Sequence, residues 1–265
     1  MQLPLYQADA FTSKLFGGNP AALVPLEEWL ADDLLQAIAA ENNLAETAFI
    51  VPAGRGYQLR WFTPGAEVPL CGHATLATAH LLWSELGYEE EEIVFSTKSG
   101  ELTARRAGAL IEMDFPAQPP QEIALRPEFT AAVGAEPLRA LAVPGDNDKI
   151  MLVFAHAAQV AELKPDPRAV AGLPYCGVIC TAPGAGFDCD FVSRFFAPVI
   201  GIDEDPVTGS AHTLLTPYWA AQLDREQLRA RQISARGGEI ECELRADRVL
   251  LRGTAVTYLR GHMVL

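Results

Sequence analysis

The chain has 265 residues, a length that accommodates one or two domains. Hydrophobic residues make up 49% of it and charged residues 20%, which excludes a disordered chain because this much apolar surface can offset the entropy lost on folding. With 34 acidic and 20 basic residues the net charge is −14, which argues against nucleic acids and anionic membranes as main partners because such a surface repels phosphate groups.

Segments with a helical or a strand period follow one another along the chain. In chain order the sequence predicts a helix over 32–41, strands over 57–61, a helix over 74–86, strands over 109–115, 150–155 and 178–181, and a helix over 211–223. Asp32 and Asp33 are expected to cap the first helix and to face its positive end. We therefore expect a mixed α and β protein in which strands predominate.

An internal repeat indicates two similar domains. Phe62-Thr63-Pro64 precedes Cys71-Gly72-His73 and an apolar helix, and Phe196-Ala197-Pro198 precedes Thr208-Gly209-Ser210 and a second apolar helix. The proline-rich stretch over 115–127 has the composition of a linker. We place the domains at residues 1–117 and 118–265, and the last strand could return to the first domain.

The five cysteines do not resemble a disulfide framework, because they are odd in number and widely scattered. Cys176 and Cys180 lack a second close pair at zinc-site spacing, so we expect no metal. The N-terminus has no basic start followed by an apolar run, and no segment has 18 uninterrupted apolar residues. We expect a cytoplasmic protein, and the apolar content leaves room for a homodimer.

The repeated turn offers groups that can bind a small anion. A glycine before a helix lets the chain turn sharply and exposes the first backbone N–H groups at the positive end of the helix dipole. Two such helix starts facing one another would form a cleft for a carboxylate. Either turn could also be an ordinary helix start.

The second turn also carries acid and hydroxyl groups. Asp205 precedes Pro206, and Thr208 and Ser210 flank Gly209. Asp205 could be a turn residue, and Thr208 or Ser210 could cap the helix. The same groups could instead bind a substrate or assist a proton transfer.

Glu46 is a candidate acid–base residue. It lies where a helix ends and a strand begins, in the segment 42–50. There it could be a solvated carboxylate. It could also project into a cleft, where partial burial lets a carboxyl group exchange a proton near neutral pH.

These residues resemble the phenazine-biosynthesis isomerase-like family, in the order and spacing of its motifs over nearly the whole chain. The segments that carry the resemblance are Gly18-Asn19-Pro20-Ala21-Ala22, Asn43-Leu44-Ala45-Glu46-Thr47-Ala48-Phe49, Arg60-Trp61-Phe62-Thr63-Pro64, Cys71-Gly72-His73-Ala74-Thr75 and 201–212. The resemblance implies an α+β, diaminopimelate-epimerase-like fold. In this fold, two similar domains each have a curled β-sheet around a central helix, and the active site lies between them.

The resemblance also implies a role for each site residue. Glu46 takes the position of the family's proton-shuttling glutamate, and His73, Asp205 and Ser210 take positions that bind substrate or assist proton movement. Gly72 and Gly209 supply backbone N–H groups. The expected function is a cofactor-independent isomerase that moves a proton within a small conjugated carboxylate or amino-acid-like substrate. The chain has neither GxGxxG after a strand nor GxxxxGK[ST], so we expect no cofactor.

Two alternatives remain open at the level of sequence. A two-base epimerase or racemase of this fold uses a cysteine in each repeated turn, but this chain has Cys71 in the first turn and Thr208 in the second. A second alternative is a non-catalytic protein that binds a small ligand in the same cleft and performs no reaction.

The remaining candidate residues are expected to have structural roles or stay open. His80 is expected to be a core or interface residue, and His212 could face either the cleft or the helix interior. Asn19-Pro20 is predicted to form a plain turn.

Overall fold

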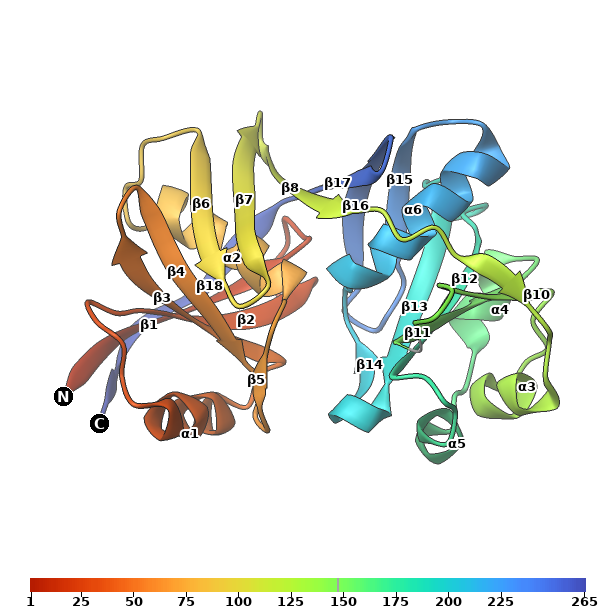
Figure 1. Cartoon of the computed structure of the whole chain (residues 1–265), viewed down its shortest axis with the longest axis horizontal. Helices are drawn as coiled ribbons and strands as arrows, with labels where there is room; N and C mark the ends of the chain where they lie inside the picture. Colours follow the sequence, from red (N-terminus) through yellow and green to blue (C-terminus); the bar gives the residue numbers. More distant parts are fainter. Residues whose placement is uncertain (147) are drawn as a thin grey trace. The chain divides into compact units, whose positions relative to one another are not determined.

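Figure 1 shows a computed structural model of the protein, which describes residues 1–146 and 148–265. The chain forms two compact units. Unit 1 comprises residues 1–114 and 252–265, and unit 2 comprises residues 115–251. Within the described part of the chain, no helix combines the length and the apolar character needed to span a lipid bilayer.

Unit 1 is built on a mixed sheet with the strand sequence β18–β1–β2–β3–β4–β6–β7–β8. Its strands are β1 (Gln2–Ala10), β2 (Asn19–Pro25), β3 (Glu46–Ala53), β4 (Gly56–Phe62), β6 (Glu92–Thr97), β7 (Gly100–Ala107), β8 (Leu110–Pro116) and β18 (Ala255–Val264). The pairs β2–β3 and β4–β6 are parallel and the others antiparallel, while the short β5 (Glu67–Val68) pairs with the end of β4. The C-terminal strand β18 thus belongs to unit 1.

Helix α2 (Gly72–Ser84) is the central helix of unit 1 and packs against β1, β2, β3 and β18 (Figure 1). Nine of its thirteen residues are buried, as expected of a helix that is apolar on nearly all sides. Helix α1 (Asp32–Asn42) instead covers a smaller apolar cluster with Leu35 against Phe49 and Phe62. The predicted capping of α1 is wrong: Ala31 is the N-cap residue, and Asp32 and Asp33 lie in the first turn, where they still face the positive end.

Unit 2 repeats this arrangement. Its strands are β9 (Gln121–Ile123), β10 (Arg139–Ala142), β11 (Lys149–Val153), β12 (Gly177–Pro183), β13 (Phe191–Ala197), β14 (Ile202–Asp205), β15 (Gln227–Gln232), β16 (Gly238–Arg245) and β17 (Arg248–Gly253), the last of which ends in unit 1. The series β10–β11–β12–β13–β15–β16 alternates antiparallel and parallel pairs exactly as β1–β2–β3–β4–β6–β7 does. The short β14 pairs with β13 as β5 pairs with β4.

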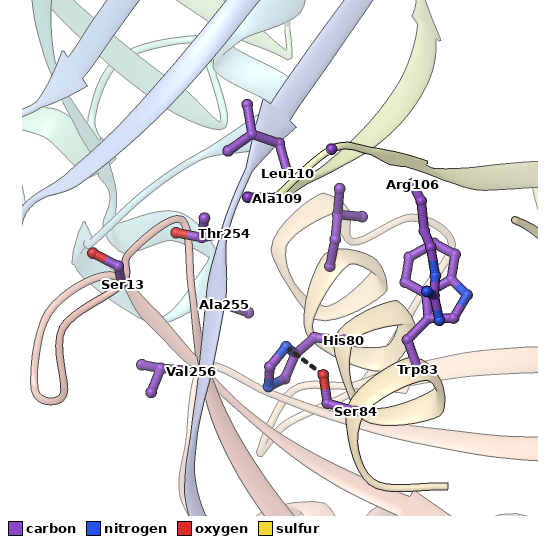
Figure 2. A pocket seen from close by; sticks show the side chains of 12 residues that line it. Ser13, His80, Trp83, Ser84, Arg106, Ala109, Leu110, Thr254, Ala255 and Val256 are labelled. Carbon is purple, nitrogen blue, oxygen red and sulfur yellow. Dashed lines mark hydrogen bonds between the residues drawn. The ribbon is translucent and has the colours of Figure 1, made fainter. Parts of the chain in front are cut away.

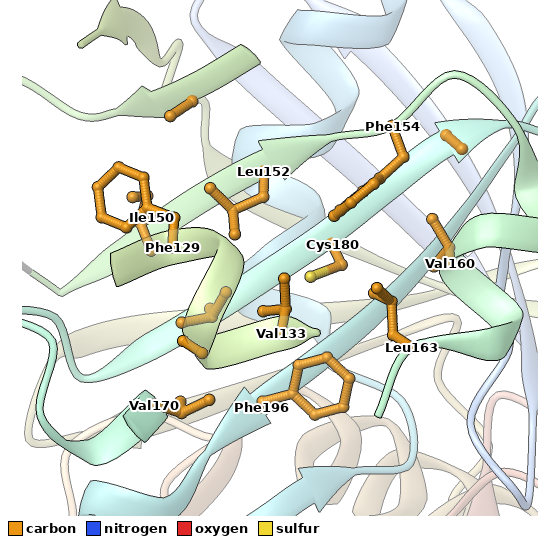
Figure 3. Close-up of a cluster of buried hydrophobic side chains, with 14 of the residues drawn as sticks. Phe129, Val133, Ile150, Leu152, Phe154, Val160, Leu163, Val170, Cys180 and Phe196 are labelled. Atoms are coloured by element: carbon orange, nitrogen blue, oxygen red, sulfur yellow. The ribbon is translucent and has the colours of Figure 1, made fainter. Parts of the chain in front are cut away.

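Helices cover the unit 2 sheet. They are α3 (Pro127–Val133), α4 (Ala157–Glu162), α5 (Pro167–Ala171), the 3-10 helix η1 (Pro198–Ile200) and α6 (Gly209–Leu223). Figure 3 shows the cluster in which Phe129 and Val133 of α3 pack against strand residues such as Leu152. Cys180 is buried in the same cluster, whereas Cys176 is exposed.

Helix α6 tolerates an internal proline because a partner outside the helix replaces the lost hydrogen bond. Pro217 has no N–H to donate to the carbonyl of Thr213, four residues earlier. The backbone N–H of Gln118 donates to this carbonyl at 3.0 Å instead, and the Thr213 hydroxyl donates to Gln118 Oε1 at 2.9 Å. The proline-rich segment before β9 is thereby attached to α6.

All seven segments predicted from periodicity coincide with elements of the predicted type. The two central helices begin two residues earlier than predicted, at Gly72 and Gly209. Apolar periodicity does not detect these starts because glycine contributes no side chain to the pattern. The α+β prediction is confirmed.

We expect Leu152→Ala to lower the free energy of unfolding by about 2–5 kcal/mol, because this fully buried side chain would leave a cavity in the unit 2 core. Urea denaturation followed by circular dichroism measures the loss. Leu138→Ala is the matched control, because Leu138 is 60% exposed and its truncation should cost less than about 0.5 kcal/mol. Equal losses in both variants would contradict this account of the core.

Candidate active site

A carboxylate and an imidazole meet inside unit 1. Glu46 is the first residue of β3, and His73 is the second residue of α2. His73 Nε2 lies 3.1 Å from Glu46 Oε2, and the two residues are only 5% and 9% exposed. Despite this short distance neither atom has a well-aligned hydrogen bond within the described residues. Both atoms therefore keep hydrogen-bonding capacity that a substrate or a transferred proton could use.

The other ring nitrogen of His73 faces Asn19 and Cys71. Asn19 Nδ2 lies 3.1 Å from His73 Nδ1, and Cys71 Sγ lies 3.6 Å from the same atom. Asn19 is the first residue of β2 and is completely buried, so the prediction of a plain turn is wrong. Gly18 makes this placement possible: its φ is +61°, and a Cβ there would lie 2.1 Å from the Ala10 carbonyl oxygen.

Charge within this cluster favours a protonated His73. Burial raises the pKa of the Cys71 thiol to about 11, and the charge of Glu46 adds to this, so the thiol is neutral at pH 7. Burial also opposes a charge on His73, but its contacts with Cys71 and Glu46 outweigh burial and raise the pKa of His73 well above its usual value.

The start of α2 supplies backbone donors beside this pair. Cys71 is the N-cap residue and Gly72 the first helical residue, so the first N–H groups of the helix have no partner within it. The Cys71 carbonyl accepts both the Thr75 N–H at 3.1 Å and the Thr75 hydroxyl at 2.6 Å. These two hydrogen bonds fix the first turn of α2, which carries His73.

In unit 2, Asp205 is fixed by hydrogen bonds at the start of α6. The Thr208 hydroxyl donates to Asp205 Oδ2 at 2.5 Å. Gln232, at the end of β15, accepts the Thr208 N–H at 2.9 Å and donates to the Asp205 carbonyl at 2.7 Å. All three residues are buried, so the turn between β14 and α6 is rigid.

His212 is anchored to its own helix through one ring nitrogen. Its Nδ1 lies 2.8 Å from the Thr208 carbonyl, four residues earlier, and donates to it. Burial lowers the pKa of His212 to about 4, so the ring is neutral at pH 7. Gly209 and the half-buried Ser210 are the first two residues of α6, next to this carbonyl.

The expected site residues thus form one group in each unit. Glu46, Gly72 and His73 lie together in unit 1. Asp205, Gly209 and Ser210 lie together in unit 2. Sequence reasoning missed the two amides, Asn19 and Gln232, that fix His73 and Asp205.

Glu46, Cys71 and His73 could be considered as metal ligands, since one ligand atom from each lies within 4.8 Å of the others. However, Cys71 faces Nδ1 of the ring and Glu46 faces Nε2. The absence of a metal at these residues stays a prediction.

A cavity of about 480 Å³ lies elsewhere in unit 1 (Figure 2). Its walls include His80, Trp83 and Ser84 from the second half of α2, and Arg106, whose guanidinium lies 5.3 Å from the Trp83 ring. His80 is hydrogen-bonded to Thr257 at 3.0 Å, which fits the expected structural role. Neither Glu46 nor His73 lines this cavity.

The model of the phenazine biosynthesis-like protein family matches residues 8–261. A protein of Pseudomonas aeruginosa named an uncharacterized isomerase is 48% identical over the full length of both chains. The crystal structure of a phenazine biosynthesis protein of the PhzF family from Enterococcus faecalis is 44% identical over the full length of both chains, with a TM-score of 0.95.

A more distant likeness concerns the fold alone. The structure of a predicted epimerase from Pseudomonas aeruginosa has a TM-score of 0.75 at 20% identity and covers 99% of each chain. The fold is the diaminopimelate-epimerase-like fold, as expected from the sequence.

We expect Glu46→Gln to lower the pKa of His73, because burial then acts on the imidazolium without the opposing carboxylate. Nitrogen-15 NMR of the imidazole over a pH series measures this shift. The pKa of His73 is higher in the folded than in the unfolded chain. The contact therefore stabilises the fold below the unfolded pKa, about 6.5, and this stabilisation is lost as the pH rises through the folded pKa. An unchanged His73 titration in the variant would contradict the coupling.

Proposed function

The chain is an isomerase that belongs to the phenazine biosynthesis-like protein family, and we propose that it moves a proton within a small conjugated carboxylate or amino-acid-like substrate. The observation that carries this proposal is the nearly buried Glu46 carboxylate, 3.1 Å from the His73 imidazole. A carboxylate in such a place can accept a proton from carbon and return it.

The proposed reaction has two proton transfers. Glu46 takes a proton from a carbon flanked by unsaturation, so that the C–H bond breaks, an O–H bond forms, and the electron pair is delocalised toward the substrate carboxylate. The Glu46 carboxyl group then returns the proton at another carbon, where the new C–H bond uses that electron pair. His73 is proposed to hold the Glu46 carboxylate in place during both transfers.

Backbone and hydroxyl groups are proposed to bind the anionic substrate. The first N–H groups of α2 and α6, at Gly72 and Gly209, are positive ends of helices and suit a carboxylate or the charge that develops on it. Ser210 is proposed as a further donor. Asp205 is proposed to orient the substrate, because Thr208 and Gln232 hold it in a fixed position.

The contacts of Cys71 and Thr208 argue against two-base cysteine chemistry. Cys71 has a raised pKa of about 11 and so carries little thiolate at neutral pH. Thr208 stands where a second cysteine would be needed, and its hydroxyl donates to Asp205.

A purely binding role is disfavoured because a nearly buried ionic pair is costly to maintain and contributes little to stability. Independence from cofactors and a homodimeric state stay predictions.

We expect Glu46→Gln to lower turnover by about 100-fold or more with little change in ligand affinity, because the amide keeps the shape but cannot accept a proton. The measurement is deuterium incorporation from solvent, together with turnover, for a substrate that the wild type accepts. Asp205→Asn is the comparison, and its loss should be smaller because Asp205 only orients.

The opposite pattern would place the base elsewhere. If Glu46→Gln keeps near-normal exchange while Asp205→Asn or Cys71→Ala abolishes it, the assignment of Glu46 is wrong. Circular dichroism of each variant shows whether a loss reflects the site or the fold.

A further inference from the structure

We propose that Asn19 is a positioning residue for His73, whose ring it holds through Nδ1 so that Nε2 faces Glu46 in either protonation state of the ring. The inference rests on the proposed function, because it assigns the residue that keeps the Glu46–His73 pair aligned. Asn19 acts through His73 and is given no contact with the substrate.

Two opposed contacts fix the orientation of the His73 ring. Asn19 Nδ2 lies 3.1 Å from Nδ1, and Glu46 Oε2 lies 3.1 Å from Nε2. The three side chains come from β2, from the start of β3 and from the first turn of α2, whose backbones pack against one another. Turning the ring would break the hydrogen bond of Nδ1 with Asn19 and move Nε2 away from Glu46.

An amide suits this position because it carries both a donor and an acceptor. Next to a neutral ring, the Asn19 amide donates from Nδ2 to Nδ1, which leaves the ring proton on Nε2, facing Glu46. Next to an imidazolium, the same amide turned by 180° accepts the Nδ1 proton in Oδ1. The side chain can therefore follow a proton that enters or leaves the pair.

The other neighbours of the ring cannot take this role. Cys71 Sγ is 3.6 Å from Nδ1, and a thiol is a weak donor and a weak acceptor. Glu46 faces only Nε2. Glu46 and Cys71 are the ionisable groups that face the ring, and Asn19 is the uncharged one. A completely buried asparagine is also costly unless its polar atoms are used.

Two variants separate positioning from packing. Asn19→Asp has the same shape but can only accept, so it should fix the proton on Nδ1 and raise the pKa of His73 by about one unit or more. Asn19→Leu removes both the donor and the acceptor of the amide. His73 Nδ1 should therefore lose its hydrogen bond with residue 19, and the ring should no longer keep one orientation. Nitrogen-15 NMR of the His73 ring over a pH series reads the tautomer and the pKa directly, and it needs no substrate.

Turnover gives the second readout. We expect Asn19→Leu to lower kcat by about 10- to 100-fold with little change in KM, because a misplaced ring no longer aligns Glu46. We expect Asn19→Asp to displace the pH profile of kcat in the direction of the NMR pKa. Asn42→Leu is the matched control: Asn42 donates to the Thr47 hydroxyl at 3.1 Å in the same unit, and its loss should leave the His73 spectrum unchanged.

Wild-type ring nitrogen shifts and pKa in both Asn19 variants would overturn the proposal. A change in the His73 spectrum as large in Asn42→Leu as in the Asn19 variants would also overturn it, since the effect would then be one of general packing. Failure of the proposed function can be distinguished from failure of this inference. Full activity of Glu46→Gln would contradict the proposed function, whereas the NMR spectra report only on the hydrogen bond between Asn19 and His73.

Discussion

The chemistry that we propose for this protein depends on a carboxyl group that is kept almost out of water beside an imidazole. Glu46 and His73 lie 3.1 Å apart and are nearly buried, which would be costly for either group alone. Each makes the charge on the other tolerable. The surrounding structure is therefore organised to bring the start of β3 and the start of α2 together and to hold both in place.

The two units use one backbone design for different purposes. Each alternates antiparallel and parallel strand pairs, adds a short strand, and starts its central helix at a glycine after an N-cap residue. In unit 1 this helix start carries Cys71 and His73, and His73 lies beside the Glu46 carboxyl group. In unit 2 the equivalent positions are Thr208 and Ser210, and Gln232 joins the turn to a network of hydrogen bonds that includes Asp205. The repeat thus keeps backbone donors at both helix starts, but the carboxyl–imidazole pair that we propose to exchange a proton lies at the helix start of unit 1.

Local patterns predicted the elements because helical and strand periods depend on near neighbours in sequence. The helix-to-strand junction identified Glu46 as a candidate and the turn before the last helix identified Asp205, whereas the role of His73 was implied by the family resemblance alone. Local patterns could not identify Asn19, because a Gly-Asn-Pro segment is typical of a turn, and Asn19 becomes buried only when β2 pairs with β1 and β3. Gln232 gave no signal either: it contacts Thr208 across 24 residues of sequence, and no local period encodes that approach. The predicted cap of α1 was wrong because Ala31 is the N-cap residue and the helix itself begins at Asp32.

The most direct test of the account is a double-mutant cycle on the Glu46–His73 pair. Rates of deuterium exchange would be measured for Glu46→Gln, His73→Gln and the double variant on one accepted substrate. If the two side chains act as a single proton-transferring unit, the double variant should be about as slow as Glu46→Gln alone, because the first substitution already removes what the second would remove. Losses that multiply, so that the double variant shows the product of the two single effects, would mean that Glu46 and His73 act independently and would contradict the account.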